Sequence, residues 1–297
     1  MSKKVEVKKS FHKKKGWKRL ENRQPKVIEN TKQAIFIKGR NTSQLLTNAC
    51  DDLALYKKPY VIKFNQKHEI SCFEDERPLE VYSTGKDASL LVVMTHNKKR
   101  PHCLTFVRMY DGHVLDMEEM MILEYKPIKE FSGEKPPSAM RLMYSFNGSE
   151  FETDEHLRMF KNMIVDFYRN DVNEKLVVDE ITAMMVFTAI EKKVYMSVYH
   201  VKLVKGLPEM NEVGPRIVFM PGRNKFGAED MREEAMRIPK ELQPPKKKKN
   251  VKTDMFGQKI GIVHAQTEDL DSLARTVKLP KALREEAKEL RKKKLSK

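Results

Sequence analysis

The excess positive charge of this chain is confined to its two ends, and that layout limits which part can fold. Residues 1–26 hold 11 basic and 2 acidic side chains, and residues 223–297 hold 21 basic and 12 acidic. Residues 27–222 hold 26 basic and 28 acidic side chains and are nearly neutral. Basic ends with few apolar residues cannot bury enough surface to fold alone. We therefore expect a folded domain over 27–222, a basic flexible N-terminal arm over 1–26 and a basic extended C-terminal tail over 223–297.

Length and cysteine usage narrow the class of protein further. A chain of 297 residues forms one large domain or two small ones with tails. Its three cysteines form no CxxC pair, which argues against a disulfide scaffold and for a reducing compartment. No apolar stretch approaches the roughly 20 residues that span a bilayer. The sequence predicts a soluble, intracellular protein without membrane contact.

The first half of the expected domain alternates strands and helices. Residues 34–37 are an apolar run that predicts a strand, and Asn41, Thr42 and Ser43 are candidate N-caps for the helix that follows. Residues 88–95 predict a central strand, and 104–110 a second strand after a basic loop. Asp116, with a glutamate three residues later, resembles a capping box and predicts another helix.

The same order of elements recurs in the second half. Residues 142–146 predict a strand, Thr153 is the expected N-cap of a helix, and 181–203 predict a hairpin. Strand, glycine, capped helix and hairpin thus occur twice. This predicts an α/β protein with an internal duplication, its lobes covering about 27–135 and 136–222.

Gly214-Pro215-Arg216 marks the end of the second lobe. Gly-Pro signals a turn, and the four apolar residues after Arg216 predict a short buried strand. The structural interpretation is a turn that enters the last strand, and the functional one is a loop that touches a polyanion. Basic arms around a neutral body favour the second, because proteins that grip phosphate backbones have this charge layout. Solubility and nuclear import use the same lysines and stay open for each arm.

Basic side chains in polar segments are the candidate phosphate contacts. Residues 63–70 have the composition of a functional loop, and three adjacent cations occupy the hairpin tip after residue 95. A solvated loop is the alternative at each place. Sparse apolar residues after position 250 are candidate anchors on a partner surface. The candidate RNA-binding residues are Lys63, Lys67, Lys98, Lys99, Arg100, Arg216, Arg223, Lys246, Lys247, Lys248 and Lys249.

Three segments resemble a known family. Lys63–Leu79 contains KFN followed by FED, with Cys72 where a proline is expected, and Glu212–Arg216 carries GPR. The tail carries PKKKKN at Pro245–Asn250 and Phe256-Gly257 beyond it. Together they resemble the Brix-domain family, above all its ribosome production factor two branch, and the tail pattern resembles that branch alone.

This resemblance implies a two-lobed Brix domain in which each lobe is a mixed sheet with helices, similar to an anticodon-binding domain. It implies a non-catalytic ribosome biogenesis factor of the nucleus and nucleolus. Such a factor binds rRNA, supports rRNA processing and helps incorporate the 5S RNA particle into the precursor of the large ribosomal subunit. The implied partners are 5S RNA, large-subunit precursor rRNA, the regulator of ribosome synthesis as a heterodimer, and the two ribosomal proteins of the 5S particle. Among the residues of the GPR motif, the resemblance assigns RNA contact to Arg216.

The alternatives are an RNA-processing enzyme and a general basic nucleic-acid-binding nuclear protein. An enzyme needs a nucleophile with its base, clustered metal ligands or a phosphate-cradling glycine loop. The sequence contains no Walker pattern and no GxGxxG. His96, His102, Cys103 and His113 have no zinc-site spacing. We therefore predict no catalytic residue, no metal site and no cofactor.

Overall fold

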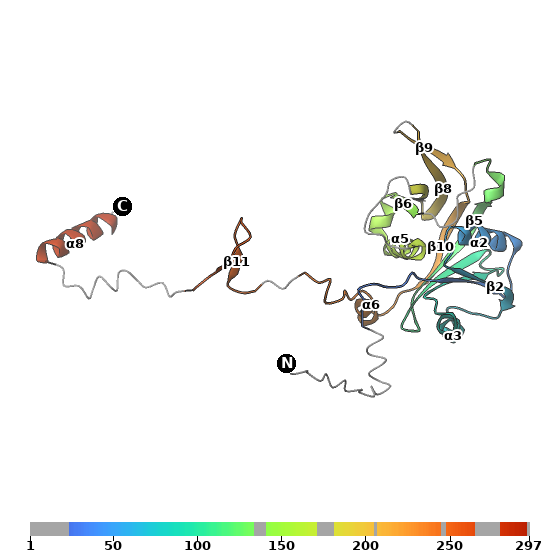
Figure 1. The fold of residues 1–297 in the computed structure, drawn as a ribbon, viewed down its shortest axis with the longest axis horizontal. Coiled ribbons are helices and arrows are strands. Elements are labelled where there is room, and N and C mark those ends of the chain that lie inside the picture. Colours follow the sequence, from blue (N-terminus) through green and yellow to red (C-terminus); the bar gives the residue numbers. More distant parts are fainter. Residues whose placement is uncertain are drawn as a thin grey trace, which may run out of the picture. The chain divides into compact units, whose positions relative to one another are not determined.

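The structure is a computed structural model that describes residues 24–133, 141–170, 181–204, 207–244, 248–264 and 280–295. It divides into two compact units, Met1–Leu242 and Gln243–Lys297. Figure 1 labels the elements of both. The first unit continues past position 223, where we expected the tail to begin. The last strand ends only at Lys225, and helix α6 (Glu229–Ala235) follows it.

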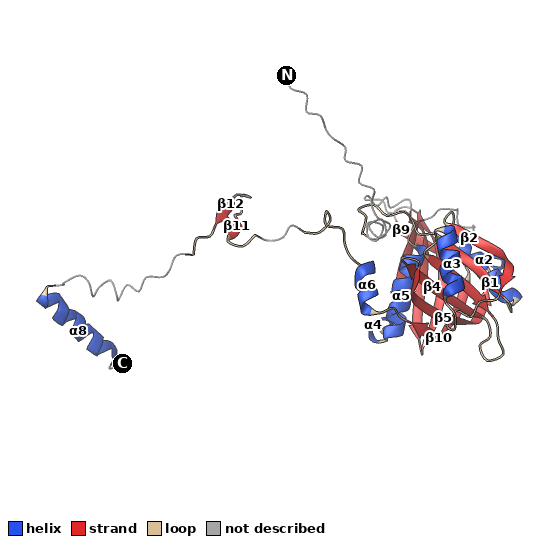
Figure 2. Cartoon of the chain, turned by 90° about the horizontal axis from the view of Figure 1, so that it is seen from below, coloured by secondary structure: helices blue, strands red, loops and turns tan. Residues whose placement is uncertain are grey.

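A single sheet runs through the first unit (Figures 1 and 2). Strands β1, β2 and β3 are mutually parallel neighbours, β6 and β7 are parallel, and the other pairs are antiparallel. This mixed sheet with helices confirms the predicted α/β class. In spatial order its strands are β2 (Val61–His68), β1 (Ala34–Gly39), β3 (Leu90–Thr95), β4 (Cys103–Tyr110), β5 (His113–Lys126), β10 (Arg216–Lys225), β8 (Lys193–Val204), β7 (Ile181–Ile190) and β6 (Arg141–Asn147), and β9 (Leu207–Glu212) pairs with β8.

The sheet consists of two similar halves that meet at β5 and β10. In the first half β1 lies parallel to β3, and β3, β4 and β5 follow antiparallel. In the second half β6 lies parallel to β7, and β7, β8 and β10 follow antiparallel. The antiparallel β5–β10 pair, from Arg216 opposite Lys126 to Lys225 opposite Met117, joins the halves. The predicted duplication is therefore present, but as one continuous sheet. The first half additionally has β2 and α3 (Arg77–Lys86).

Helix starts follow local side-chain chemistry. Of the three candidate residues, Ser43 is the N-cap of α2 (Gln44–Leu55), and its Oγ accepts a hydrogen bond from the Leu46 amide at 3.3 Å. The cap of α5 (Glu155–Tyr168) is Asp154, so the prediction of Thr153 was wrong. Thr153 ends the short helix α4 (Glu150–Thr153), and its hydroxyl donates back to the Ser149 carbonyl. Asp154 is extended and accepts from the His156 amide at 2.9 Å.

Two predicted segments have different structures. Residues 63–70, expected as a loop, lie mostly in the edge strand β2, whose polar side chains are tolerated because one side of the strand faces water. The helix expected from Asp116 is instead the middle of the long strand β5 (His113–Lys126). The acidic spacing imitates a capping box, but β4 and β10 supply backbone partners on both sides of this segment.

Apolar side chains from both sheet faces form two cores. Helices α2 and α5 cover one face along both halves, with Phe160, Phe167 and Phe187 buried among their neighbours. Helix α3 covers the other face in the first half only, over Ile35, Leu91 and their neighbours. The corresponding face of the second half has partly exposed side chains instead.

A row of buried carboxylates on β5 is neutralised by cations from other elements. Asp116 accepts hydrogen bonds from Arg108 on β4 (Nε at 3.1 Å) and from Arg232 on α6 (3.2 Å). Glu118 pairs with His156 on α5 at 2.9 Å. Burial raises the pKa of Glu118, and its hydrogen bond to His156 raises the pKa of that imidazole. Buried charges persist only when paired, so these contacts fix β4, α5 and α6 around β5.

The turn that leads into β10 is held in a narrow space. Gly214 has a φ of +73° and is followed by a cis peptide bond to Pro215. The Tyr56 hydroxyl donates to the Gly214 carbonyl, and the Gly214 amide donates to the Val198 carbonyl at 3.3 Å. A Cβ at position 214 would lie 2.5 Å from two ring carbons of Phe131. The structural interpretation of this motif is therefore confirmed.

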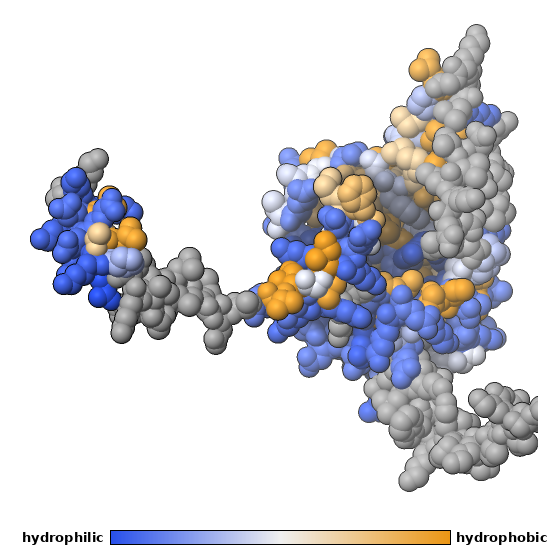
Figure 3. All heavy atoms as spheres, turned by 60° about the vertical axis from the view of Figure 1, so that its left-hand side comes forward, coloured by the Kyte–Doolittle hydropathy of each residue, from blue (hydrophilic) through white to orange (hydrophobic). Residues whose placement is uncertain are grey.

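The second unit contains a hairpin and a helix. Strands β11 (Val251–Thr253) and β12 (Lys259–Gly261) form the hairpin, and α8 (Lys281–Leu295) is a helix within the segment that we expected to be an extended tail. Figure 3 shows α8, at the left, as mainly hydrophilic with a few hydrophobic side chains. Among the described residues, no helix is long and apolar enough to cross a membrane.

We predict that Asp116→Ala lowers the free energy of unfolding by about 3–5 kcal/mol, because it leaves two arginines beside an empty buried site. The measurement is chemical denaturation of the full chain. Glu124→Ala is the matched control, since Glu124 is on the same strand but exposed, and it should change stability by less than about 0.5 kcal/mol. Equal effects of the two substitutions would contradict the assigned role of Asp116.

We further predict that Gly214→Ala destabilises the first unit by about 2–4 kcal/mol, from the left-handed backbone and the clash with Phe131. Gly85→Ala is the control, because Gly85 lies in α3 with open space around its Cα. Helix propensity should make that variant more stable by up to about 1 kcal/mol. Thermal unfolding of both variants would show shifts of opposite sign, and a neutral Gly214→Ala would refute the packing argument.

Candidate nucleic-acid interface

The carboxyl ends of three parallel strands bring several basic side chains to one edge of the sheet. Because β1, β2 and β3 are parallel, Arg40, Lys67 and the loop after Thr95 lie at the same edge. Lys67, Lys98 and Lys99 are exposed and Arg100 is half-buried. We call Arg40, Lys67, Lys98, Lys99 and Arg100 the basic edge. The structure thus brings together four of the predicted residues.

The loop that carries Lys98 and Lys99 is firmly positioned. The Asn97 amide donates to the Arg100 carbonyl at 3.0 Å, which closes a turn with the two lysines at its tip. The His96 amide donates to the Asn41 carbonyl at 2.9 Å, and the His102 ring lies 2.8 Å from the capping hydroxyl of Ser43. Burial lowers the pKa of His102, and His96 lowers it further. The tip is therefore attached to the start of α2 and presents its ammonium groups to solvent.

Arg40 was not among the predicted residues. It directly follows Gly39 at the end of β1, and that position is a usable signal, because ligands of open α/β sheets bind beyond the carboxyl ends of the strands. Its guanidinium pairs with Glu69 at 2.7 Å, but both side chains are about three-quarters exposed. Such a surface pair contributes little energy and exchanges readily for a phosphate.

Lys63 and Arg216 lie away from the basic edge. Lys63 is in the middle of β2, and its ammonium bonds to Asp51 on α2 at 2.6 Å, so it ties a strand to a helix. Arg216 is the first residue of β10 and pairs with Lys126 on β5. On the same strand β5, Met121 pairs with the start of β4, so Lys126 lies five residues further along β5. That offset corresponds to roughly 17 Å along a strand. Arg216 is exposed, and its hydrogen bonds from Nε and Nη2 to Glu212 raise its pKa.

Arg223 is used mainly inside the fold. Its Nε donates to Glu119 Oε2 at 2.9 Å and its Nη2 to Oε1 at 3.1 Å, while its guanidinium stacks over Phe73 at 4.2 Å. Burial raises the pKa of Glu119, but the hydrogen bonds and charge of Arg223 outweigh burial and hold that pKa below its usual value. Arg223 therefore compensates a buried carboxylate and joins β10 to β5 and to the segment before α3.

The predicted tail lysines belong to the second unit. Lys248 and Lys249 are exposed and precede the hairpin β11–β12. Lys246 and Lys247 lie outside the described residues, as do residues 1–23 of the N-terminal arm.

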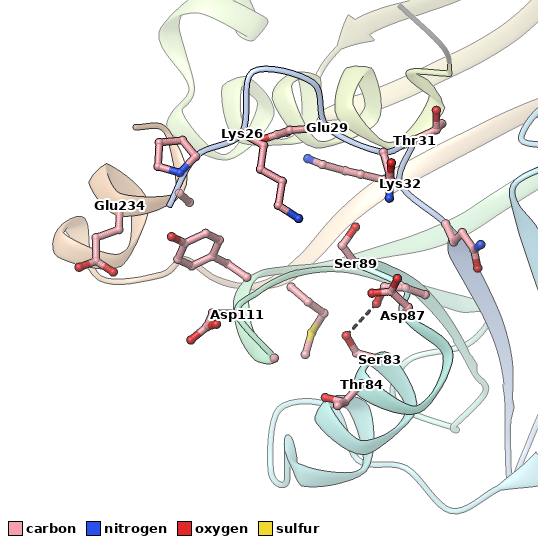
Figure 4. Close-up of a pocket in the computed structure, with 18 of the residues that line it drawn as sticks. Lys26, Glu29, Thr31, Lys32, Ser83, Thr84, Asp87, Ser89, Asp111 and Glu234 are labelled. Carbon is pink, nitrogen blue, oxygen red and sulfur yellow. Dashed lines mark hydrogen bonds between the residues drawn. The ribbon is translucent and has the colours of Figure 1, made fainter. Parts of the chain in front are cut away.

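A pocket of the first unit, drawn in Figure 4, is unsuited to a polyanion. Its volume is about 760 Å³, and residues before β1, at the end of α3, at the β4–β5 turn and at the end of α6 line it. Asp87, Asp111, Glu29 and Glu234 face it together with Lys26, Lys32 and Arg237, so both signs of charge are mixed. Since Asp87 precedes β3, the cavity is at the opposite end of that strand from the basic edge.

Clustered metal ligands are absent from the described part of the chain. The buried acidic residues of β5, Asp116, Glu118 and Glu119, each have a cationic partner in the fold, as described above. The three cysteines are buried, and burial raises the pKa of Cys72 and of Cys103 to about 12, so neither thiol is a ready nucleophile.

Comparison with known proteins identifies relatives of this chain. A family model described as Brix domain matches residues 39–223. The Schizosaccharomyces pombe protein named ribosome production factor 2 homolog is 39% identical over 268 residues, covering 86% of this chain and 84% of that protein. The Mus musculus protein of the same name is 36% identical over 247 residues, covering 82% and 80%. A solved structure of a probable ribosomal biogenesis protein from Aeropyrum pernix K1 has a TM-score of 0.44 at 12% identity, covering 64% of this chain and 96% of that one.

The match over the sheet and the similarity along most of the length place the chain in one family: it belongs to the Brix-domain proteins, among the ribosome production factor 2 homologues.

Proposed function

We propose that this chain is a non-catalytic ribosome biogenesis factor that binds rRNA and helps to incorporate the 5S RNA particle into the precursor of the large ribosomal subunit. It acts in the nucleus and nucleolus and supports rRNA processing. The names of its relatives support the general role. The observation that carries RNA binding is the loop tip at Lys98 and Lys99, where a hydrogen-bonded backbone turn presents two exposed lysines that have no carboxylate partner among the described residues.

The basic edge and the tail contribute to binding in different ways. The edge is rigid, so it orients the body on a folded RNA through contacts with phosphates at fixed spacing. The lysines of the second unit add sequence-independent affinity through counterion release. Shape and protein partners then provide specificity, because the deep major groove of an RNA helix hides its base edges.

The body has the features of a scaffold. Its buried carboxylates are engaged by arginine and histidine, so they hold strands together and are not arranged around an open site. An RNA-processing enzyme would need an exposed cluster of acids or a nucleophile next to a base. Among the described residues, the basic edge has no exposed cluster of acids, and the Ser43 hydroxyl that lies beside His102 serves as the N-cap of α2.

The second half of the sheet offers a surface for a protein partner. By register, Met143, Met184, Thr188, Ile190 and Tyr195 share the face opposite α5, and Met143, Ile190 and Tyr195 are exposed. We call these five residues the open face. The equivalent face of the first half is covered by α3. We propose that the regulator of ribosome synthesis packs on the open face as the heterodimer partner, and that the 5S particle proteins join the complex through RNA.

The RNA-binding proposal predicts a steep salt dependence of the affinity for 5S RNA. Removing residues 243–297 should flatten the slope of log K against log salt, and Lys98→Ala with Lys99→Ala should reduce it by about 1.5, since each phosphate contact contributes about 0.7–0.9. The truncation begins after Leu242, where the first unit ends, because an end before α6 would remove Arg232 and leave Asp116 with Arg108 as its remaining partner. Fluorescence anisotropy with transfer RNA as competitor measures both slope and preference.

Lys26→Ala with Lys86→Ala is the matched control for the double lysine variant. It removes the same charge at the cavity side of the first half, and its slope should equal that of the unaltered chain. A salt slope that neither the truncation nor the tip variant changes would contradict the assignment of these surfaces. Equal affinity for 5S RNA and transfer RNA would leave only a general basic nucleic-acid-binding protein.

The partner proposal predicts that Tyr195→Glu weakens the complex with the regulator of ribosome synthesis at least about tenfold, as expected for a buried aromatic anchor. Val81→Glu is the control, because Val81 is more exposed but lies on α3 in the first half. Copurification and titration calorimetry of the two proteins give the result. An undiminished affinity of Tyr195→Glu would place the partner elsewhere.

A further inference from the structure

The turn of hairpin β11–β12 carries two large apolar side chains where turns normally carry small or polar ones. Met255 is 98% exposed and Phe256 is 89% exposed. The strand residues beside them are exposed as well, so packing within the described hairpin does not account for these side chains. An apolar pair at such a position indicates a contact with another molecule.

The backbone of this turn is fixed by its own hydrogen bonds. The Asp254 amide donates to the Gln258 carbonyl, and the Gly257 amide donates to the Asp254 carbonyl, both at 2.9 Å. Gly257 has a φ of +78°, which a three-residue hairpin loop requires at its last position. The Asp254 carboxylate accepts from the Met255 amide at 2.8 Å. Met255 and Phe256 are thus held at the tip of the loop.

The base of the hairpin is also defined locally. Asn250 has a φ of +61°, and its carbonyl accepts from the Ile262 amide at 2.7 Å. Its side-chain oxygen lies 2.9 Å from His264 Nε2. A hairpin without a core is marginally stable, so these contacts are what specifies its shape. A tip shaped before binding loses less conformational entropy when it engages a ligand.

The charge of the hairpin selects the kind of ligand. Residues 248–264 contain four lysines and one acidic residue, Asp254, whose carboxylate is engaged in the turn. All four lysines are exposed, and none forms an ion pair with another described residue: Lys248, Lys249, Lys252 and Lys259. An apolar pocket on a protein would explain the tip but not these cations. An aromatic side chain among lysines fits an unpaired nucleic-acid segment, because bases stack on the ring and phosphates bind the ammonium groups.

We propose that residues 248–264 form a finger that holds a single-stranded RNA segment, with a base stacked on Phe256, Met255 packed against its edge, and the lysines on the flanking phosphates. This inference rests on the proposed RNA binding and adds a distinct site for unpaired nucleotides, separate from the phosphate contacts of the basic edge.

The test compares the affinity of the full chain for a short oligouridine and for an RNA duplex of the same length. Phe256→Ala should weaken oligouridine binding by between about 5-fold and about 100-fold, the range for loss of one base–aromatic stack. Duplex affinity should stay unchanged, because a paired base offers no free face. The salt slope should also stay unchanged, since no cation is removed.

Three further variants separate stacking from general apolar contact. Phe256→Trp should keep oligouridine affinity, whereas Phe256→Leu should lose as much as Phe256→Ala because it retains apolarity without an aromatic face. Val263→Ala is the matched control, since Val263 is equally exposed at 89%, and it should bind like the unaltered chain. The finger is refuted if Phe256→Ala binds oligouridine normally or if leucine replaces phenylalanine without loss. An unaltered chain that binds neither probe would refute the proposed RNA binding as well, whereas duplex binding with no effect at Phe256 would refute the finger alone.

Discussion

The pairing of buried carboxylates on β5 with cations from other elements is the contact on which the rest of the fold depends. Asp116, Glu118 and Glu119 are almost fully buried, and an unpaired carboxylate there would cost several kcal/mol. Their partners come from β4, α5, β10 and α6, which are far apart in the sequence. A shift of β10 by one residue would turn Arg223 to the other face of the sheet and leave Glu119 unpaired. The charges therefore select one register for the strands that join the two halves.

The local elements of this protein were predictable because they depend on contacts between near neighbours. The cap at Ser43, the strands over 88–95 and 104–110 and the duplication all follow from patterns a few residues long. The helix predicted at Asp116 failed for the opposite reason. An acid followed three residues later by a glutamate satisfies a helix start locally, but here each carboxylate has a partner supplied by a distant element. A sequence pattern that spans three residues contains no information about partners supplied by distant elements.

The basic residues of the candidate site also divide into those that local sequence predicts and those whose environment depends on distant elements. Lys98 and Lys99 lie at an exposed loop tip, which their adjacency between two predicted strands made predictable, and the half-buried Arg100 follows them. Arg223 was selected for the same reason, as a basic residue in a polar segment. In the fold, however, it stacks on Phe73 and neutralises Glu119. Arg40 lacks a neighbouring cation in sequence and reaches the edge only through the parallel pairing of β1, β2 and β3. Basic character alone therefore does not tell whether a cation faces solvent or neutralises a carboxylate of the fold.

The use of cations inside the fold also explains why the excess positive charge is located outside the sheet. Within residues 27–222, basic and acidic side chains nearly balance, and many of the cations hold strands or helices together, so adding phosphate ligands there would compete with folding. The lysines of the hairpin β11–β12 hold no other described element in place, because the hairpin has no core. Its shape is defined by hydrogen bonds of its own backbone and of the Asn250 and Asp254 side chains. The hairpin can therefore combine exposed lysines with an aromatic tip, whereas an exposed phenylalanine on the sheet would add to the apolar area of the open face. The proposed contacts with paired and with unpaired RNA thus lie on different units of one chain.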